Sequence, residues 1–259
     1  MKDIKIAFFD IDGTLVDMGR KEISQKTLEM LRKLREREVL LCLATGRSPM
    51  VLPHFRDIEF DVFLTFNGSY CYNAGEMIFS NPIPTEEIKR LIKNAAAIGR
   101  PVSIATKSRL AANGTDRDLE DYFEIAGLKV EVADDFDMLS EGEIYQIMLG
   151  LYESEYANMM KGIRHAKIAA WWDRAADIIP ADGGKGVAVG KILEYYHLDR
   201  AEAIAFGDGN NDIEMLQSVG TGVAMGNGSK QLKAVADDVC GHVAEDGIYE
   251  YCLEHGLIE

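Results

Sequence analysis

Two short acidic motifs stand out in this sequence because their spacing suits chemistry at an oxygen-rich centre. The first is Asp10-Ile11-Asp12-Gly13-Thr14-Leu15, in which two carboxylates stand two residues apart. In extended backbone such residues share a side, and the turn that Gly13 permits lets them diverge around one point. One carboxylate can then attack a phosphorus atom while the other gives and takes protons. For this motif alone, a solvated turn after a strand is an equally good interpretation.

The second acidic motif is Gly207-Asp208-Gly209-Asn210-Asn211-Asp212, at the start of an amphipathic stretch. Its carboxylates and amides are the oxygen ligands that Mg²⁺ prefers. A calcium loop does not fit, because Ile213 and Val219 stand where the turn glycine and the bidentate glutamate belong. A dinucleotide-binding loop does not fit either, because Asp212 replaces the third glycine. A helix N-cap with acidic residues near the helix dipole remains open.

An anionic transition state beside carboxylates also needs cations and hydrogen-bond donors. Lys185, in Asp182-Gly183-Gly184-Lys185-Gly186, is a lone lysine in a loop that opens a helix, and the spacing of a Walker A loop is absent. Thr45 can donate its hydroxyl, and the backbone amides after it, starting with Gly46, can add more. Taken alone, Lys185 is more typical of a surface lysine and Thr45 of a loop cap. Arg47 could face the site or brace the loop, and the sequence does not choose.

The elements that must position these residues are short apolar runs alternating with helix-length amphipathic stretches, a pattern typical of a parallel sheet flanked by helices. Each of four predicted strands delivers a polar residue at its carboxyl end, the edge where open α/β sheets bind ligands. These strands are 4–9 before Asp10, 39–44 before Thr45, 62–66 before Asn67, and 203–206, which runs through Gly207 into Asp208. Helices are expected over 24–37, with Ser24 as N-cap, and over 186–197.

The middle of the chain has a different pattern. Thr85 is expected to cap a helix over 86–98, and a second helix is expected over 116–126. Strands are expected over 102–107, 143–151 and 167–173, with a short helix over 155–162. The predicted fold is therefore an α/β core with a Rossmann-like parallel sheet, formed by 1–81 and 182–259 and interrupted by an α+β domain at 82–181. Within that domain, one of Trp171 and Trp172 could stack on a sugar or a base.

The composition limits the partners. The 259 residues include 28 Lys and Arg against 43 Asp and Glu, a net charge of −15, with 47% hydrophobic residues. This is a globular composition that disfavours broad contact with nucleic acids or anionic membranes but permits a small phosphorylated ligand at a local site. The four cysteines have no paired spacing, and no apolar run approaches a membrane span or a signal peptide. We expect a cytoplasmic protein, as a monomer or a homodimer.

Taken in order, four segments resemble the haloacid dehalogenase superfamily: FFDIDGTL at 8–15, ATGR at 44–47, the GGKG lysine at 185 and GDGNND at 207–212. The position and size of the insert resemble the Cof-type subfamily with its type IIB α+β cap. Phe66-Asn67-Gly68 and Val223-Ala224-Met225-Gly226-Asn227 are further matches. The glycine pair before Lys185 departs from the family, which more often has bulkier residues there.

The resemblance implies a role for each matched residue. Asp10 is the nucleophile that becomes an aspartyl phosphate, and Asp12 is the general acid and base. The Mg²⁺ ligands are the Asp10 carboxylate, the Asp12 backbone carbonyl and Asp208, with Asp212 bound directly or through water. Lys185 contacts the phosphoryl oxygens and restrains Asp10. The remaining phosphate-binding residues are Thr45, Gly46, Asn67, Gly68 and Asn211.

The predicted function is a Mg²⁺-dependent phosphohydrolase that acts on a small phosphorylated metabolite, a sugar phosphate or a similar compound. A phosphomutase or phosphotransferase with the same aspartate pair is the main alternative, because it differs only in where the phosphoryl group goes. A phosphate-binding or phosphoacceptor module is less compatible with Asp12, since an acid/base beside an acyl phosphate shortens its lifetime. The sequence does not identify the substrate.

Overall fold

The computed structural model describes residues 3–20, 22–170 and 172–259, and these form two compact units. The core unit comprises the chain up to Arg47, Leu52–Ser80 and Gly184–Glu259. The insert unit comprises Ser48–Val51 and Asn81–Gly183. Each unit is built on its own sheet, one mostly parallel and one antiparallel. The predicted fold class, a parallel α/β core with an inserted α+β domain, is confirmed.

Among the described residues, the core-unit sheet has eight strands in the order β13-β12-β11-β1-β2-β3-β4-β5. Neighbours from β13 to β3 pair in parallel, whereas β4 and β5 add an antiparallel hairpin at one edge. The strands are β1 (Ile6–Phe9), β2 (Leu40–Ala44), β3 (Val62–Thr65), β4 (Tyr70–Asn73), β5 (Met77–Ser80), β11 (Ala203–Gly207), β12 (Thr221–Ala224) and β13 (Asp238–Val239).

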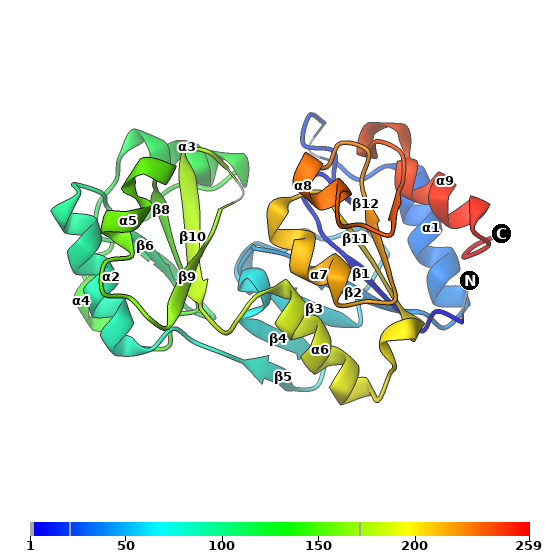
Figure 1. Ribbon diagram of the computed structural model, residues 1–259, viewed down its shortest axis with the longest axis horizontal. Coiled ribbons are helices and arrows are strands. Elements are labelled where there is room, and N and C mark those ends of the chain that lie inside the picture. Colours follow the sequence, from blue (N-terminus) through cyan, green and yellow to red (C-terminus); the bar gives the residue numbers. More distant parts are fainter. Residues whose placement is uncertain (1–2, 21, 171) are drawn as a thin grey trace. The chain divides into compact units, whose positions relative to one another are not determined.

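Helices cover both faces of this sheet, and β1 shows why. All four of its side chains are buried, with Ile6 and Phe8 in one apolar cluster and Ala7 and Phe9 in the other. A strand covered on both faces is continuously apolar, as the sequence predicted. Figure 1 shows α1 and α9 on one side of the sheet and α6 and α7 on the other. The core-unit helices are α1 (Gln25–Glu36), α6 (Lys185–Tyr196), α7 (Ile213–Gln217), α8 (Lys230–Lys233) and α9 (Gly247–Glu254).

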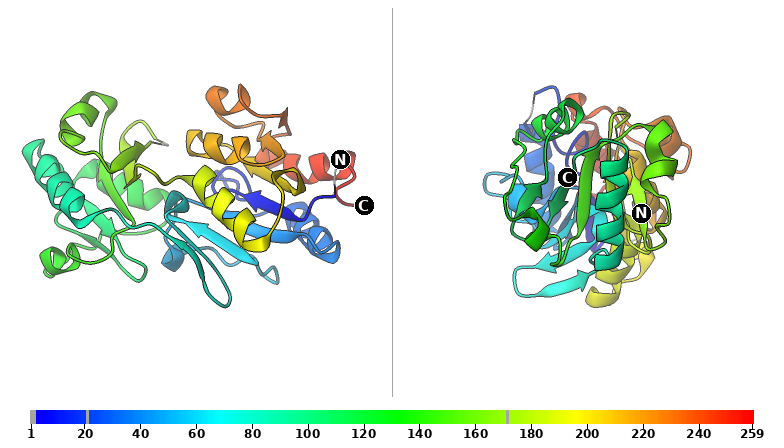
Figure 2. Two further views of the ribbon diagram at one scale, coloured as in Figure 1. Left: turned by 60° about the horizontal axis from the view of Figure 1, so that its bottom comes forward. Right: turned by 90° about the vertical axis from the view of Figure 1, so that its left-hand side faces the viewer.

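The insert unit has an antiparallel sheet in the order β7-β6-β8-β10-β9 and its own apolar cluster. Ile147 of β8 lies in this cluster with Ile88 and Leu91 of α2, which runs beside the strands (Figure 2). The strands are β6 (Ser103–Ala105), β7 (Leu110–Ala112), β8 (Gln146–Gly150), β9 (Ala166–Ala169) and β10 (Ala175–Pro180). The helices are α2 (Thr85–Ala97), α3 (Arg117–Ile125), α4 (Phe136–Leu139) and α5 (Tyr156–Met159).

Single-turn 3₁₀ helices connect several of these elements. They are η1 (Pro49–Val51), η2 (Phe66–Gly68), η3 (Glu153–Glu155), η4 (Arg200–Glu202), η5 (Asn210–Asp212) and η6 (Val243–Glu245). Two of them, η2 and η5, follow β3 and β11 and carry residues of the candidate site. No helix within the described ranges combines the length and the apolar character needed to cross a bilayer.

Several sequence-based expectations about local structure are wrong. Lys185 is the first residue of α6 and not part of the preceding loop, and Pro84 rather than Thr85 is the N-cap of α2. The sequence also missed β4, β5, β7, β10, β12 and β13. Most of these strands have two to four residues, too few to show a periodicity, and β10 ends in a proline that reads as a boundary. Trp171 lies outside the described residues.

We predict that Ser24→Ala destabilises the core unit. The Ser24 hydroxyl accepts a hydrogen bond from the Thr27 amide at 3.0 Å at the start of α1, and an N-cap of this kind contributes about 0.5–2 kcal/mol. Thr85→Ala is the matched control, because α2 has no side-chain cap bond. Urea unfolding curves should show the loss for Ser24→Ala and almost none for Thr85→Ala. Equal losses in the two variants would contradict the capping role.

Candidate active site

The site forms where two neighbouring parallel strands end. β1 and β11 pair with Phe9 opposite Phe206, and the amide of Asp10 donates to the Phe206 carbonyl at 3.0 Å. Asp10 therefore leaves β1 beside the point where β11 passes through Gly207 into Asp208. Residues far apart in the chain are brought together because parallel strands deliver their carboxyl ends to one edge.

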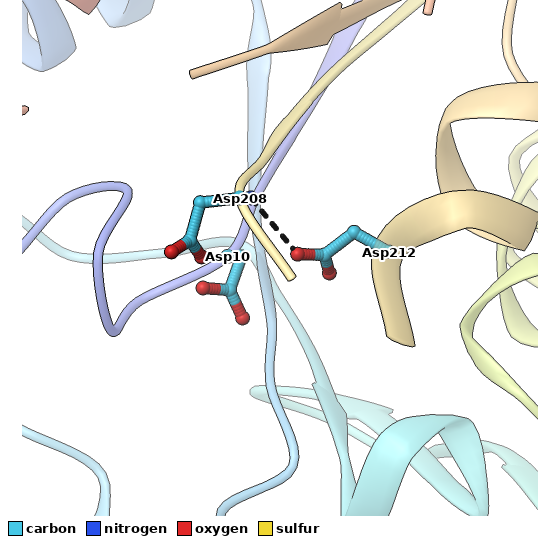
Figure 3. Close-up of side chains that lie close together, drawn as sticks. All are labelled: Asp10, Asp208 and Asp212. Atoms are coloured by element: carbon cyan, nitrogen blue, oxygen red, sulfur yellow. Dashed lines mark hydrogen bonds between the residues drawn. The ribbon is translucent and has the colours of Figure 1, made fainter. Parts of the chain in front are cut away.

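Three carboxylates gather at this edge (Figure 3). One oxygen from each of Asp10, Asp208 and Asp212 lies within 4.8 Å of the others. Asp10 and Asp212 are buried and Asp208 is partly exposed. The side-chain carboxylate of Asp12 is not in this group, and it has a different partner, described below. The cluster thus consists of three of the four aspartates that the sequence singled out.

Lys185 supplies positive charge inside the cluster. Its ammonium donates to Oδ1 of Asp10 at 2.7 Å and to Oδ1 of Asp212 at 2.5 Å. The lysine is only 1% exposed, so the surface interpretation that the sequence favoured for Lys185 alone is wrong. An ammonium is buried only when it is paired and hydrogen-bonded, and here two carboxylates provide that pairing.

The carboxylates outnumber the single ammonium, and the pKa values of these groups are shifted as a result. Burial raises the pKa of Asp10 well above its ordinary value, Lys185 opposes this effect, and the neighbouring carboxylates add to it. Burial and the charge of Asp212 raise the pKa of Asp208 to about 7. Burial disfavours the charged form of Lys185, but Asp10 and Asp212 outweigh it and raise the pKa of the amine. The cluster therefore has three acids and only one ammonium to balance them.

These residues fit a divalent metal ion. The donors are carboxylate oxygens, which hard cations such as Mg²⁺ prefer, and a dication would compensate the excess negative charge of the cluster. Asp208, being partly exposed, leaves one side of the group accessible. The arrangement can thus hold a metal beside Asp10.

Glycines clear the space that the cluster occupies. Gly13 has a φ of +90°, and a Cβ there would lie 2.2 Å from Oδ2 of Asp208. A Cβ at Gly207 would lie 2.6 Å from the Cβ of Asp212. The amides of Asp208 and Gly209 donate to Oδ2 of Asp212 at 3.1 and 3.0 Å, which fixes that carboxylate. Backbone and side chains therefore approach too closely here for any larger residue.

The remaining predicted phosphate-binding residues form a second connected group. The amide of Asn67 donates to the Thr45 carbonyl at 3.0 Å, and Nδ2 of Asn211 donates to Oδ1 of Asn67 at 3.0 Å. A Cβ at Gly46 would lie 3.0 Å from Nδ2 of Asn67, and one at Gly68 would lie 2.5 Å from the carbonyl oxygen of Gly184. The loops after β2, β3 and β11 are thus tied together through Asn67.

The turn that carries Asn67 is strained. Phe66 and Asn67 both have a φ of +52°, and Gly68 follows at +96°. Non-glycine residues in this region cost free energy and persist only where their surroundings impose them. The amide of Phe66 donates to the Arg47 carbonyl at 3.0 Å, and the amide of Ser69 donates to the Phe66 carbonyl at 3.1 Å, which stabilises the turn. In this turn, Oδ1 of Asn67 accepts a hydrogen bond from Nδ2 of Asn211.

Asp12 pairs with Arg47. Nε of Arg47 donates to Oδ2 of Asp12 at 2.8 Å, and Nη2 donates to Oδ1 at 2.6 Å. The sequence left open whether Arg47 faces the site or braces its loop, and in the structure its side chain contacts a residue of the first acidic motif.

Sequence reasoning did not identify Asn227 as a site residue. Its Nδ2 donates to the Gly13 carbonyl at 2.7 Å and lies 3.5 Å from Oδ2 of Asp208, while its Oδ1 accepts from the Val243 amide. Asn227 therefore links the turn after Asp12 to the second acidic motif. The sequence identifies the segment 223–227 only as a further match to the family, and its contact with Asp208 depends on the tertiary fold.

Comparison with known proteins agrees with this geometry. The sequence pattern that defines haloacid dehalogenase-like hydrolases matches residues 7–252. The chain belongs to the haloacid dehalogenase-like hydrolase family. The resemblance stated from the four motifs is therefore confirmed, and the protein is a hydrolase of that family.

Relatives within the family match over nearly the whole chain. YkrA of Bacillus subtilis is 34% identical, over 99% of this chain and 100% of YkrA. The 5-amino-6-(5-phospho-D-ribitylamino)uracil phosphatase YitU of Bacillus subtilis is 28% identical, over 95% of both chains. Among solved structures, a sugar phosphatase of subclass IIB of this superfamily has a TM-score of 0.91 at 28% identity, covering 98% of this chain and 100% of its own.

Gly13→Ala should abolish metal binding. The new Cβ would displace the Asp208 carboxylate, so Mg²⁺ should raise the melting temperature of the natural protein but not that of the variant. Gly99→Ala is a matched control, because Gly99 also has a positive φ, +72°, but nothing lies within 4 Å of a Cβ there. Both variants carry a backbone cost of about 1–3 kcal/mol. If Mg²⁺ raised the melting temperature of Gly13→Ala as much as that of the natural protein, the space at Gly13 would not be needed for metal binding.

Lys185→Met should destabilise the core unit, because it leaves two buried carboxylates without their ammonium. Removing one partner of a buried ion pair costs about 3–5 kcal/mol. Lys191→Met, in the same helix, removes only an exposed pair with Glu194 at 3.0 Å and should cost less than about 1 kcal/mol. Chemical denaturation of both variants measures the difference. If the two losses were alike, the buried ion pair would contribute little.

Proposed function

We propose that this protein is a Mg²⁺-dependent phosphohydrolase that removes the phosphate group from a small phosphorylated metabolite through an aspartyl-phosphate intermediate on Asp10. The observation that carries the proposal is the buried cluster in which Lys185 contacts Asp10 and Asp212 beside Asp208. A carboxylate nucleophile, a cation at hydrogen-bond distance and a place for a metal are what phosphoryl transfer to an aspartate requires.

In the first step, a carboxylate oxygen of Asp10 attacks the phosphorus atom and the ester P–O bond breaks. Lys185 holds Oδ1 of Asp10, which directs Oδ2 toward the attack. Asp12 gives its proton to the departing alkoxide, so that an alcohol leaves. Asp10, Asp208 and Asp212, together with the Asp12 carbonyl, would hold Mg²⁺, which would supply positive charge that compensates the charge of the phosphoryl group.

In the second step, the aspartyl phosphate is hydrolysed. Asp12 is now ionised and takes a proton from a water molecule, whose oxygen attacks the phosphorus atom and breaks the bond to Asp10.

Thr45 is one of the proposed phosphate-binding residues. Its hydroxyl oxygen accepts a hydrogen bond from the Arg47 amide at 3.1 Å, so the hydroxyl proton is directed elsewhere and can bind a phosphoryl oxygen. Gly46, Asn67, Gly68 and Asn211 complete the phosphate-binding side. Positioning and charge compensation supply most of the rate.

The substrate class that the comparisons support is a small phosphate monoester. A similar solved structure is named a sugar phosphatase, and YitU is named for a phosphorylated ribityl compound. We propose a sugar phosphate or a similar metabolite for this chain, with residues 82–181 acting as the cap that selects the leaving group.

We also propose a cytoplasmic location, as expected from the sequence. All four cysteines are buried free thiols, which supports it.

Asp10→Asn should abolish turnover of p-nitrophenyl phosphate in the presence of Mg²⁺. An amide of the same shape cannot form the acyl phosphate, so the rate should fall by at least about 10³-fold, while the fold persists. Asp57→Asn is the control, since Asp57 is 60% exposed and pairs with Arg32 on the surface. Phosphate release and circular dichroism check both variants. Undiminished activity in Asp10→Asn would refute the nucleophile.

The same assay distinguishes the alternatives. A screen of sugar phosphates, nucleotides, pyridoxal phosphate and flavin mononucleotide with Mg²⁺ should release inorganic phosphate from at least one class. Isomerisation of a sugar phosphate without phosphate release would favour a phosphomutase. A phosphorylated Asp10 that survives for hours under native conditions would favour a phosphoacceptor module.

A further inference from the structure

The contact between Arg47 and Asp12 bears on how the Asp12 carboxylate is oriented in the site. The guanidinium engages both carboxylate oxygens, with Nε to Oδ2 at 2.8 Å and Nη2 to Oδ1 at 2.6 Å. Such paired bonds fix the rotation of a carboxylate as well as its position. The two side chains are 20% and 33% exposed, so the pair is partly shielded from solvent. Lysine could not reproduce this geometry, because an ammonium is a single point of charge.

Both ends of this contact rest on constrained backbone. The Arg47 amide donates to the Thr45 hydroxyl at 3.1 Å, and the Arg47 carbonyl accepts from the amide of Phe66, in the strained turn. On the other side, Asp12 forms a bridge with Val16, and the amide of Gly13 donates to the Val16 carbonyl at 2.9 Å. Arg47 therefore reaches Asp12 from a fixed support, and the strain after β3 serves this contact as well as Asn67.

The contact gives the Asp12 carboxylate one orientation. Both of its oxygens accept hydrogen bonds from a single planar guanidinium, so the carboxylate cannot rotate without breaking a bond. In the proposed hydrolysis of the aspartyl phosphate, Asp12 must meet a water molecule that is aligned for attack on the phosphorus atom, so this step depends on that orientation.

We propose that Arg47 is a positioning residue that holds Asp12 as the base for hydrolysis of the aspartyl phosphate. The inference rests on the proposed function, since it assigns a role within the second of its two steps. Arg47 acts through Asp12 and contacts no reacting atom in this role. Loss of the Arg47 guanidinium should slow breakdown of the aspartyl phosphate. Formation of the aspartyl phosphate from an activated ester should stay nearly unchanged.

The test is the kinetics of Arg47→Met with p-nitrophenyl phosphate and Mg²⁺. p-Nitrophenolate leaves without protonation, so kcat/KM reports on attack by Asp10, and kcat reports on hydrolysis of the intermediate. We expect kcat to fall about 10- to 100-fold, the scale of a misplaced catalytic group, with kcat/KM almost unchanged and KM lowered in proportion. Rapid mixing should show a burst approaching one p-nitrophenolate per site, and acid quenching should trap phosphorylated Asp10.

Two further variants make the test specific. Arg32→Met is the matched control, because Arg32 forms the same two-bond contact with Asp57, at 2.7 and 2.8 Å, but on the exposed surface. It should keep the kcat and the burst amplitude of the natural protein. Arg47→Lys keeps the charge and should recover only part of kcat, and it serves as the test variant if Arg47→Met does not fold.

Each contrary result is distinct. A parallel fall of kcat and kcat/KM in the Arg47 variants would overturn the proposal and make Arg47 a ligand of the phosphoryl group. An unchanged kcat in the Arg47 variants would overturn it and leave Arg47 a brace of its loop. A failure of the proposed function would be seen in other proteins than the Arg47 variants. The natural protein itself would release no phosphate, or Asp10→Asn would remain active.

Discussion

The contact on which the rest of the site depends is the buried ammonium of Lys185 between Asp10 and Asp212. Three carboxylates at the end of two adjacent strands repel one another, and burial increases the cost of that repulsion. The ammonium offsets part of this repulsion, and the remaining negative charge fits a divalent cation. The first turn of α6, the end of β1 and the turn η5 must therefore meet at hydrogen-bond distance. Small displacements of any of the three would leave a charge unpaired.

The surrounding backbone is built to meet that requirement. Gly13 and Gly207 lie against carboxylates so closely that even a methyl group would not fit. The turn at Phe66–Gly68 adopts unfavourable dihedral angles. In this conformation Asn67 contacts Asn211, and the amide of Phe66 donates to the Arg47 carbonyl. Strain of this kind is stable only on a rigid support. That support is the parallel sheet, whose strands are buried on both faces.

Membership of the hydrolase family and the geometry of the carboxylate cluster describe the same part of the molecule. The family pattern extends over both units, but the carboxylate cluster, Lys185 and the pair formed by Arg47 and Asp12 all lie within the core unit. The insert unit has a separate apolar cluster and a separate sheet, so its surface can vary without disturbing the site. The site in the core unit and the surface of the insert unit can therefore change independently of each other.

Features that depend on neighbouring residues could be predicted from the sequence alone. Continuous apolar runs identified β1, β2, β3 and β11, because a strand buried on both faces has no alternation. The polar residue after each run marked the edge of the sheet, and Ser24 marked the start of α1. Short strands such as β7 and β13 were missed, because two or three residues cannot show a period.

Which side chains touch is a property of the tertiary structure. Lys185 and Asp10 are 175 positions apart, and their contact was predicted from the resemblance to a known family, because the residues around Lys185 do not by themselves distinguish it from a surface lysine. The pairing of Arg47 with Asp12, across 35 positions, and the contact of Asn227 with Asp208 likewise depend on how strands and turns are stacked. Such contacts have no signature in local spacing because burial, which gives them their strength, is a property of the whole fold.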